Sequence, residues 1–420
     1  MTRHTFAAGL DRRTVLKGAG IAAVTQIASP FIISARGETA LRIGMVDPLT
    51  GVYAAPAGNE VIGAKLAVEQ VNAKGGMLGR QIELLVEDSA NDVGTGVQKT
   101  RKLIERDNVN FMIGDVNSGI AAAMAQVTAE KKILHVVSGG HTDSITGKDC
   151  HWNVFRVCNT TRMEANSVSD LLYTKYGKKW HFITPDYAFG HTLYQACADN
   201  LKKLGGTVTG NELTPLGTAD FSTFLIKART AKPDVMLLLV QGSDMINCLK
   251  QIVQFGLNKQ IHIAGTQQEL ESLAGLPHEA RIGVWMFEWY WKQPGVPHVE
   301  KFVADIRKVN GGKVPTARHW FGYTSVMTFA QVANQEKTTD AVKLARALGD
   351  LELPPEVKLQ PNKVYYRGGD HQLMTSAFVG EALASGKDDP EDLFRVDQVV
   401  AGDKTSPSVA ETGCSLQWPA

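Results

Sequence analysis

The stretch from Leu41 to Asp88 decides the fold, because it reads strand, helix, strand in close succession. "LRIGMV" (41–46) is a short apolar run typical of a buried strand. "GNEVIGAKLAVEQVNAKGG" (58–76) carries apolar residues at helical spacing and closes on two glycines, which stop a helix. "RQIELLVED" (80–88) predicts a second strand. A strand, a covering helix and another strand form the unit from which parallel sheets are built.

The same alternation continues along most of the chain. Further strands are predicted at 110–115, 132–137, 180–185, 207–212, 234–240, 260–265, 281–291, 362–366 and 373–380, and helices at 97–105, 119–131, 187–206, 221–231, 244–255, 299–310, 318–334 and 339–348. The segment 139–159 is rich in Gly, Thr, Asp and Asn and interrupts this alternation, so it separates two series of strands and helices. We therefore expect an α/β fold of two doubly wound, Rossmann-like lobes, with a ligand crevice between the carboxyl ends of their strands.

The N-terminus reads as an export signal. Arg12 and Arg13 precede a small-residue apolar run at 18–33, as in the twin-arginine motif. Thr25 and other polar residues dilute this run, and a stable membrane span needs about 20 mostly apolar residues. Small residues at 34–37 offer a cleavage site. We expect residues 1–37 to be a twin-arginine signal peptide and the mature chain to be periplasmic; an ordinary basic helix is the alternative.

Charge and hydropathy limit the classes of binding partner that we expect. The 420-residue chain has a formal net charge of +1, and its first 37 residues hold five basic residues against one acidic. The mature part is therefore slightly acidic, which gives no reason to expect nucleic acid or an anionic membrane as a partner. After the leader no apolar run is long enough to span a bilayer, and no cysteine follows the leader at once, so we expect no direct membrane insertion.

The five cysteines fall into two groups. Cys197 and Cys248 sit on the apolar faces of predicted helices and Cys158 in a strand-like run, so all three read as small buried hydrophobic residues. Cys150 and Cys414 sit in turn-like sequence, the more favourable context for a disulfide. No Cys/His spacing matches a metal site, and we expect neither a metal nor a cofactor.

Several motifs resemble those of a known family. "IGMVDPLTG" (43–51), "MIGDVNSG" (112–119), "DYAFG" (186–190) and "RGGDHQL" (367–373) occur in the order found in type I periplasmic solute-binding proteins of branched-chain-amino-acid-type ABC importers, the leucine/isoleucine/valine-binding type. The resemblance covers nearly the whole mature chain. It implies a small-molecule solute, an inner-membrane ABC permease as partner, and two lobes joined by three hinge crossovers that close around the solute.

The resemblance also implies where the lobes divide. Lobe 1 is expected at 38–158 and 287–364, and lobe 2, with the C-terminal tail, at 159–286 and 365–420.

Site residues in the first lobe follow from two loops. Ser118 lies between a strand and a helix, where its hydroxyl and nearby N–H groups would favour a carboxylate; simple helix capping is the alternative. Gly139 and Gly140 leave backbone open for close approach. In amino-acid binders of the family a hydroxyl residue of this loop holds the carboxylate. His141 takes that place here, unless it is a free surface histidine.

The second lobe supplies the expected walls. By resemblance, Phe189 matches an aromatic position that packs on the ligand, with Tyr187 beside it; core packing is the alternative for Phe189. Gln241 and Gln267 follow strands and would face the crevice as polar contacts. Tyr53, in the loop after the first strand, could act as a lid.

The resemblance places an acidic residue at position 267 in amino-acid binders, where it neutralises the ligand's ammonium. Gln267 cannot supply that charge, and Glu269 or Glu271 would need a shift of register. Because an unpaired buried ammonium is costly, we expect a small organic acid of aromatic or branched-chain type. An amino acid, an amide or urea, and a ligand-sensor role stay as alternatives. No G-x-S-x-G, P-loop or H-E-x-x-H motif occurs, so we expect no enzyme.

Overall fold

The computed structural model describes residues 40–387 and 389–419. The predicted signal peptide at 1–37 lies outside the described residues.

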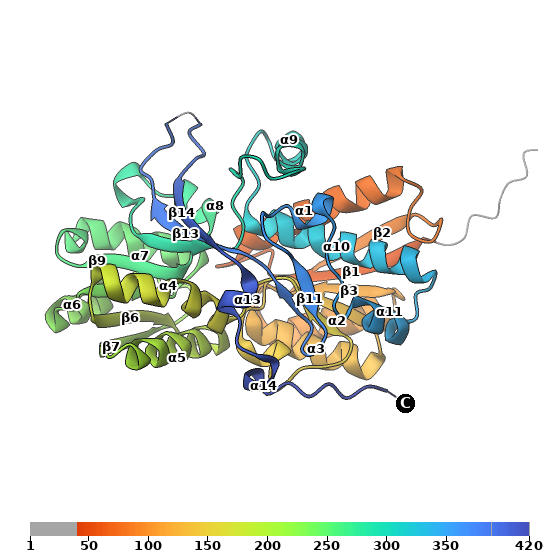
Figure 1. Ribbon diagram of the computed structural model, residues 1–420, viewed down its shortest axis with the longest axis horizontal. Helices are drawn as coiled ribbons and strands as arrows, with labels where there is room; N and C mark the ends of the chain where they lie inside the picture. The colour runs from red at the N-terminus through yellow and green to blue at the C-terminus, as the bar shows by residue number, and fades with distance from the viewer. Residues whose placement is uncertain (1–39, 388, 420) are drawn as a thin grey trace, which may run out of the picture. The chain divides into compact units, whose positions relative to one another are not determined.

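Two seven-stranded sheets organise the described chain, one in each lobe (Figure 1). The first has the order β11-β12-β5-β4-β3-β1-β2, built from β1 (Leu41–Asp47), β2 (Ile82–Asp88), β3 (Phe111–Gly114), β4 (Leu134–Val137), β5 (Val154–Arg156), β11 (Tyr365–Arg367) and β12 (Gln372–Met374). The second has the order β14-β13-β10-β9-β8-β6-β7, built from β6 (Lys179–Pro185), β7 (Thr207–Thr214), β8 (Val235–Leu238), β9 (His262–Gln267), β10 (Val284–Phe287), β13 (Ala377–Ala382) and β14 (Phe394–Val400). Pairing is parallel except at β11–β12, β10–β13 and β13–β14.

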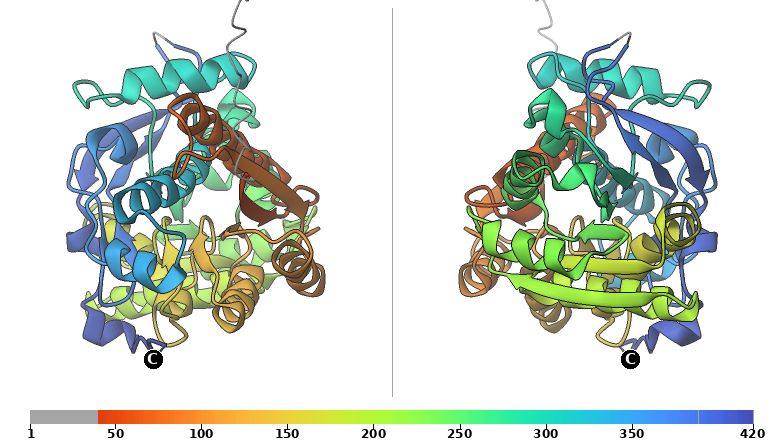
Figure 2. Two further views of the ribbon diagram at one scale, coloured as in Figure 1. Left: turned by 90° about the vertical axis from the view of Figure 1, so that its right-hand side faces the viewer. Right: turned by 90° about the vertical axis from the view of Figure 1, so that its left-hand side faces the viewer.

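Helices cover both faces of each sheet (Figure 2). The first lobe holds α1 (Ala54–Ala73), α2 (Val93–Glu105), α3 (Ser118–Lys131), α9 (Val299–Val309), α10 (Ala317–Glu336), α11 (Ala341–Leu348) and α12 (Pro355–Lys358). The second holds α4 (Thr161–Tyr176), α5 (Ala188–Lys203), α6 (Ser222–Ala231), α7 (Gly242–Gln254) and α8 (Leu270–Ala274). Short α13 (Gly402–Thr405) and α14 (Val409–Thr412) lie in the tail, and single 3-10 turns occur at Asp143–Thr146, Leu257–Lys259 and His278–Ala280. The two-lobe α/β fold is thus as predicted.

The alternation of buried residues explains the layers. In β1, Ile43 and Met45 pack in the core beneath α1 and α10, whereas Val46 packs with residues of α2 and α3 on the other face. In β6, Phe182 packs towards α4 and α5, and Ile183 towards α6 and α7. Successive side chains of a strand point to opposite faces, so a strand buried on both sides has no polar face.

The sequence analysis did not predict the long helix α4 or the short helices α8, α12, α13 and α14, and α4 is the instructive case. Its buried face contains the polar residues Thr161, Glu164, Ser167 and Ser169. Polar residues on the inner face hide the apolar periodicity by which an amphipathic helix is recognised.

The chain passes between the lobes three times, after β5, after β10 and between β12 and β13. The predicted lobe boundary at residue 365 is wrong, because β11 and β12 belong to the first sheet. The side chain of Gln372 in β12 accepts a hydrogen bond from Arg156 Nε (2.7 Å) and donates one to the carbonyl of Cys158 (2.7 Å). These bonds tie the segment to β5, with which β12 pairs, so the return to lobe 2 comes later than expected.

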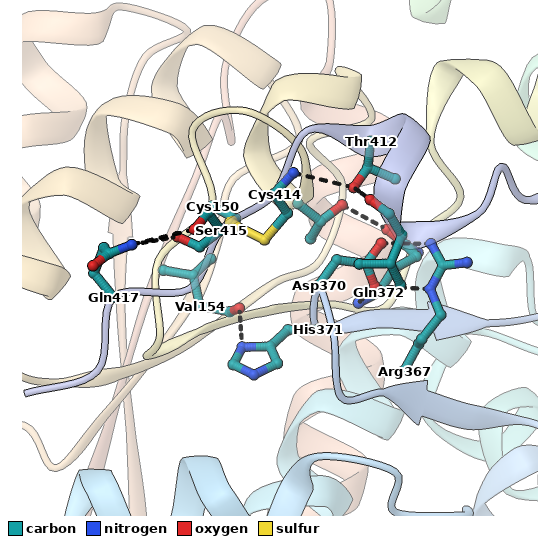
Figure 3. Close-up of a disulfide and its surroundings, with 12 residues drawn as sticks. Cys150, Val154, Arg367, Asp370, His371, Gln372, Thr412, Cys414, Ser415 and Gln417 are labelled. Carbon is teal, nitrogen blue, oxygen red and sulfur yellow. Dashed lines mark hydrogen bonds and ion pairs between the residues drawn. A yellow bond between two sulfur atoms is a disulfide. The ribbon is translucent and has the colours of Figure 1, made fainter.

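The tail returns to the first lobe through a disulfide between Cys150 and Cys414, the pair that the sequence favoured (Figure 3). The two Cα atoms are 5.6 Å apart, across a sequence separation of 264. The cysteines at 158, 197 and 248 are free and buried. Beyond the disulfide, Trp418 packs against Trp152, with ring centroids 6.1 Å apart. Among the described residues, no helix is long and apolar enough to cross a membrane.

Candidate functional site

A cavity lies where the loops after β1, β3 and β4 of lobe 1 meet those after β6, β8 and β9 of lobe 2. We call it the cleft; it is lined by Tyr53, Pro56, Val116, His141, Tyr187, Phe189, Gln241, Gly242, Gln267, Glu269 and Arg318. Its free volume is about 10 Å³, roughly the space that one water molecule needs. The lobes are therefore closed on each other, and a solute must enter by parting them or by moving these side chains.

Two aromatic residues join the lobes across the cleft. The hydroxyl of Tyr53, just before α1, lies 2.8 Å from the hydroxyl of Tyr187, just before α5. Near them, the backbone N–H of Ser243 in lobe 2 donates to the carbonyl of Val52 in lobe 1 (3.3 Å). Tyr53 thus lines the cleft at its contact with lobe 2, and its action as a lid stays a prediction. Phe189 is 3% exposed and lines the cavity, so it both packs in the core and contributes to the wall.

His141 is buried, which excludes the reading as a free surface histidine: it is 3% exposed. Its Nε2 lies 2.7 Å from an oxygen of Glu288, and its ring meets Phe189 edge-on at 5.8 Å. Glu288 directly follows β10 and also accepts hydrogen bonds from the backbone N–H of Asn159 and from the side-chain amide of Gln267 (3.0 Å). This carboxylate therefore links residues of two interlobe crossovers to the cleft.

Arg318, in the first turn of α10, is the cation at the cleft. Its Nε donates to Glu269 of lobe 2 (2.7 Å) and its Nη1 to Glu60 of lobe 1 (2.9 Å). Burial by itself would lower the pKa of Arg318, but the carboxylates of Glu269, Glu60 and Glu288 raise it well above its ordinary value. Burial raises the pKa of Glu60 to about 7, although Arg318 opposes that rise. The guanidinium therefore stays charged.

Acceptor atoms without partners also reach the cleft. Glu269 Oε2 and Gln241 Oε1 are buried and make no hydrogen bond. Gln267 donates to the other oxygen of Glu269 (3.0 Å), because the chain turns into α8 directly after β9 and brings the two side chains together. The expectation that Glu269 needs a shift of register is therefore wrong. The sequence argument that a ligand ammonium would find no carboxylate in the cleft is wrong for the same reason.

Three expected site residues lie behind the cavity wall. Asn117, rather than Ser118, caps α3 through bonds from the N–H groups of residues 119 and 120. The hydroxyl of Ser118 instead accepts from the N–H of Thr142 (3.2 Å). A Cβ on Gly139 would lie 2.4 Å from Arg318 Nη1, and one on Gly140 would lie 2.6 Å from the Cβ of Ala121. The glycine pair leaves room for the buried arginine and for close packing on α3.

The comparisons with known proteins agree with this geometry. A family model described as periplasmic binding protein matches residues 40–387. The chain belongs to the periplasmic binding protein family.

Individual relatives are distant but nearly full length. The Leu/Ile/Val-binding protein homolog 2 of Brucella abortus (strain 2308) is 28% identical over 315 residues, 73% of this chain and 82% of its own. The amino acid ABC transporter substrate-binding protein of Pseudomonas fluorescens Pf-5 superposes with a TM-score of 0.81 at 25% identity, covering 90% of this chain and all of its own. An ABC-transporter solute-binding protein of Rhodopseudomonas palustris BisB5, in complex with 3,4-dihydroxybenzoic acid, has the same fold, with a TM-score of 0.78 at 21% identity over 86% of this chain and 98% of its own. Both solved structures are of ABC-transporter solute-binding proteins, and this periplasmic binding protein shares their fold.

Sequence reasoning missed the charged centre of this periplasmic binding protein. Arg318, Glu60 and Glu288 are each the single charged residue among uncharged neighbours, in α10, in α1 and after β10. A lone charge within a buried pattern is the signal that could have found them, because buried charges are kept only when paired. In the part of the chain that the structure describes, no group of three or more His, Cys, Asp or Glu side chains could hold a metal ion.

Proposed function

We propose that this chain is the extracytoplasmic solute-binding component of an ABC importer. It captures a small solute between its lobes and presents it to an inner-membrane permease. The closed cleft with Tyr53 and Tyr187 in contact supports capture by lobe closure. Membership of a family of solute-binding proteins supports binding without catalysis. A periplasmic location fits the family, and the arginine pair Arg12 and Arg13 supports twin-arginine export.

Export provides the first prediction. Replacing Arg12 and Arg13 with lysine keeps the charge but removes the arginine pair that the route recognises. The protein should then stay in the cytoplasm, as measured by immunoblotting of periplasmic and cytoplasmic fractions. An unchanged periplasmic yield would reject this route; a replacement of Arg3 by lysine is the matched control and should change nothing.

The solute is a small carboxylic acid that also carries a hydrogen-bond donor, and Arg318 at the cleft wall is the observation that supports this. A guanidinium has five N–H donors, and the bonds to Glu269 and Glu60 leave some of them for a ligand carboxylate. The bare oxygens of Glu269 and Gln241 accept from the donor. Aromatic side chains at 53, 187 and 189 provide the walls.

Two kinds of acid have this shape. A hydroxylated aromatic acid suits the aromatic walls, and a hydroxybenzoate is bound by the similarly folded Rhodopseudomonas palustris protein. An α-amino acid suits Glu269, whose carboxylate would pair with the ammonium, and it fits the names of the Brucella and Pseudomonas relatives. Both kinds of acid carry a hydrogen-bond donor, a hydroxyl or an ammonium, that benzoate lacks.

Calorimetry with 4-hydroxybenzoate, leucine and benzoate tests this second prediction. Benzoate should bind weakest, because it has no donor for the unpaired oxygens of Glu269 and Gln241. Glu269→Gln distinguishes the other two: it should weaken leucine by about 2–3 kcal/mol, the scale of a bond to a charged group, and 4-hydroxybenzoate by much less. Glu279→Gln, at an exposed position of lobe 2, is the control.

The outcomes separate cleanly. If benzoate binds as tightly as the tighter-binding of 4-hydroxybenzoate and leucine, the unpaired oxygens of Glu269 and Gln241 have no role in solute binding. Binding of an acid that survives Arg318→Met would place the solute away from this cleft.

A further inference from the structure

A second hollow opens beside the cleft. We call it the side pocket; it lies between α1 and α10 of lobe 1 and α8 of lobe 2, and its volume is about 390 Å³, within the range of small-molecule sites. No residue lines both the side pocket and the cleft. Glu269 and Arg318 face the cleft, whereas Glu271 and His319, close to them in sequence, line the side pocket.

His319 presents a donor to the side pocket. The residue is fully buried, and its Nδ1 accepts the backbone N–H of Thr316 (3.1 Å). A neutral imidazole whose Nδ1 accepts carries its hydrogen on Nε2. Burial lowers the pKa of His319 to about 3, so the ring is neutral at physiological pH. Its Nε2 has no hydrogen-bond partner, which leaves one buried donor unsatisfied.

Glu271 presents acceptors to the same space. Both of its carboxyl oxygens are buried, and neither makes a hydrogen bond of normal geometry, although the side chain of Asn59 and the backbone N–H of Glu271 itself lie near enough to lower its pKa. Burial, with a further contribution from Glu269, raises the pKa of Glu271 to about 8, so the group is largely protonated at neutral pH. Buried polar atoms are nearly always paired in proteins, and two groups without partners in one pocket indicate an occupant that pairs with both.

The remaining walls define the occupant's body. Leu270 and Val314 are buried apolar residues of the lining, and Lys313 lies exposed at the edge, where water solvates its charge. We propose that the side pocket binds a small neutral primary carboxamide with an apolar body, whose NH₂ donates to Glu271 and whose carbonyl accepts from His319 Nε2.

Other head groups fit less well. A carboxylate could accept from His319 Nε2 and from the protonated Glu271, but it would leave the carbonyl oxygen of Glu271 without a donor and would bring a buried negative charge beside Glu269 and Glu391. An ammonium would satisfy Glu271 but would leave the donor of His319 without an acceptor. A primary amide carries a donor and an acceptor in one plane.

Three probes with the same ring test the head group. Benzamide, benzoate and benzylamine are titrated into the purified protein by calorimetry, alone and with 4-hydroxybenzoate or leucine at saturation. Benzamide should bind tightest in the side pocket, and a saturating cleft ligand should not displace it. Glu271→Met should weaken benzamide at least about tenfold, as for one lost buried hydrogen bond, whereas Glu271→Gln keeps an acceptor and should stay within about threefold.

Controls make the result decisive. Glu300→Met, at an exposed position of α9, should change no affinity, and thermal unfolding checks that the Glu271 variants are folded. The proposal is overturned if benzamide does not bind, if Glu271→Met leaves its affinity unchanged, or if cleft ligands compete with it. The side-pocket proposal does not depend on the proposed solute. If no acid binds in the cleft but benzamide binding is still weakened by Glu271→Met, the proposed cleft solute is rejected and the side-pocket proposal is kept.

Discussion

Arg318 shows how a single residue organises the cleft. Its guanidinium contacts Glu60 of lobe 1 and Glu269 of lobe 2, and all three side chains are buried. Desolvating such charges costs several kcal/mol per ion, which a good ion pair offsets only in part. The network is therefore weak evidence for stability. Its position at the lobe interface is better explained by solute binding, since charges that face a solute must be held in place beforehand.

Buried histidines couple the fold to pH, and His135 in β4 gives the third prediction. Its Nε2 lies 2.9 Å from the carbonyl of Gly114, and burial lowers the pKa of His135 to about 4. An unfolded histidine has a pKa of about 6.5, so between these values the unfolded chain binds a proton that the folded chain excludes. The contribution is fully present above about pH 6.5 and is lost as the pH falls towards 4, up to about 3 kcal/mol.

Urea unfolding of the wild type and of His135→Gln at pH 7, 5.5 and 4.5 measures this effect. The variant should lose less stability than the wild type as the pH falls. His191→Gln, at an exposed site, is the control. Carboxyls with a raised pKa, such as Asp47 and Asp115, act in the opposite direction, so only the difference between variant and wild type is diagnostic. Parallel curves would show that His135 is not buried as a neutral ring.

At the scale of elements, the crossing of α1 and α10 positions the charged centre. A Cβ on Gly63 of α1 would lie 1.9 Å from the carbonyl oxygen of His319, and one on Gly322 of α10 would lie 2.0 Å from that of Glu60. Each glycine thus lets the other helix approach at the turn that carries Glu60 or Arg318. Glycine lowers helix propensity, so its presence inside both helices reflects this close approach.

The fourth prediction follows from that contact. Gly63→Ala should destabilise the protein by about 1–3 kcal/mol, because backbone atoms cannot move aside as a side chain can. It should also weaken solute binding by displacing Glu60 from Arg318. Gly58→Ala lies in the same helix with nothing within 4 Å of the added Cβ, so it should be neutral or stabilising by up to about 1 kcal/mol. Equal effects of the two substitutions, measured by urea unfolding, would contradict the packing argument.

At the scale of the whole molecule, the tail adds a covalent tie to the three crossovers. It leaves lobe 2 after β14, and the carbonyl of Pro407 accepts a hydrogen bond from Arg367 Nη1 of lobe 1 (2.7 Å) before the tail reaches the disulfide and Trp418. The family match covers residues 40–387, so the tail side of this tie, Pro407, Cys414 and Trp418, lies beyond the part that the chain shares with the family model.

The fifth prediction concerns the disulfide. Replacing Cys150 and Cys414 together with alanine should lower the free energy of unfolding by about 2–5 kcal/mol, since a cross-link over a long loop restricts the unfolded chain. A reductant should lower the melting temperature of the wild type but leave that of the double variant unchanged. Thiol titration of the unfolded protein should find three free thiols. Five free thiols in the exported protein would reject the bridge.

The sequence by itself determined the fold class, most of the helices and strands, and the candidate pair of cysteines, because periodicity and turn residues are local signals. It also indicated three wall residues: Tyr53 follows the end of the first predicted strand, and the family resemblance implied Phe189 with Tyr187 beside it. The tertiary structure alone decided where β11 and β12 pair, because Gln372 meets Arg156 across 216 positions of sequence. It likewise decided the charged centre: Glu60, Glu269, Glu288 and Arg318 come from four separate segments and become one site only when two lobes close. Buried ion pairs depend on distance in space, which no local pattern records.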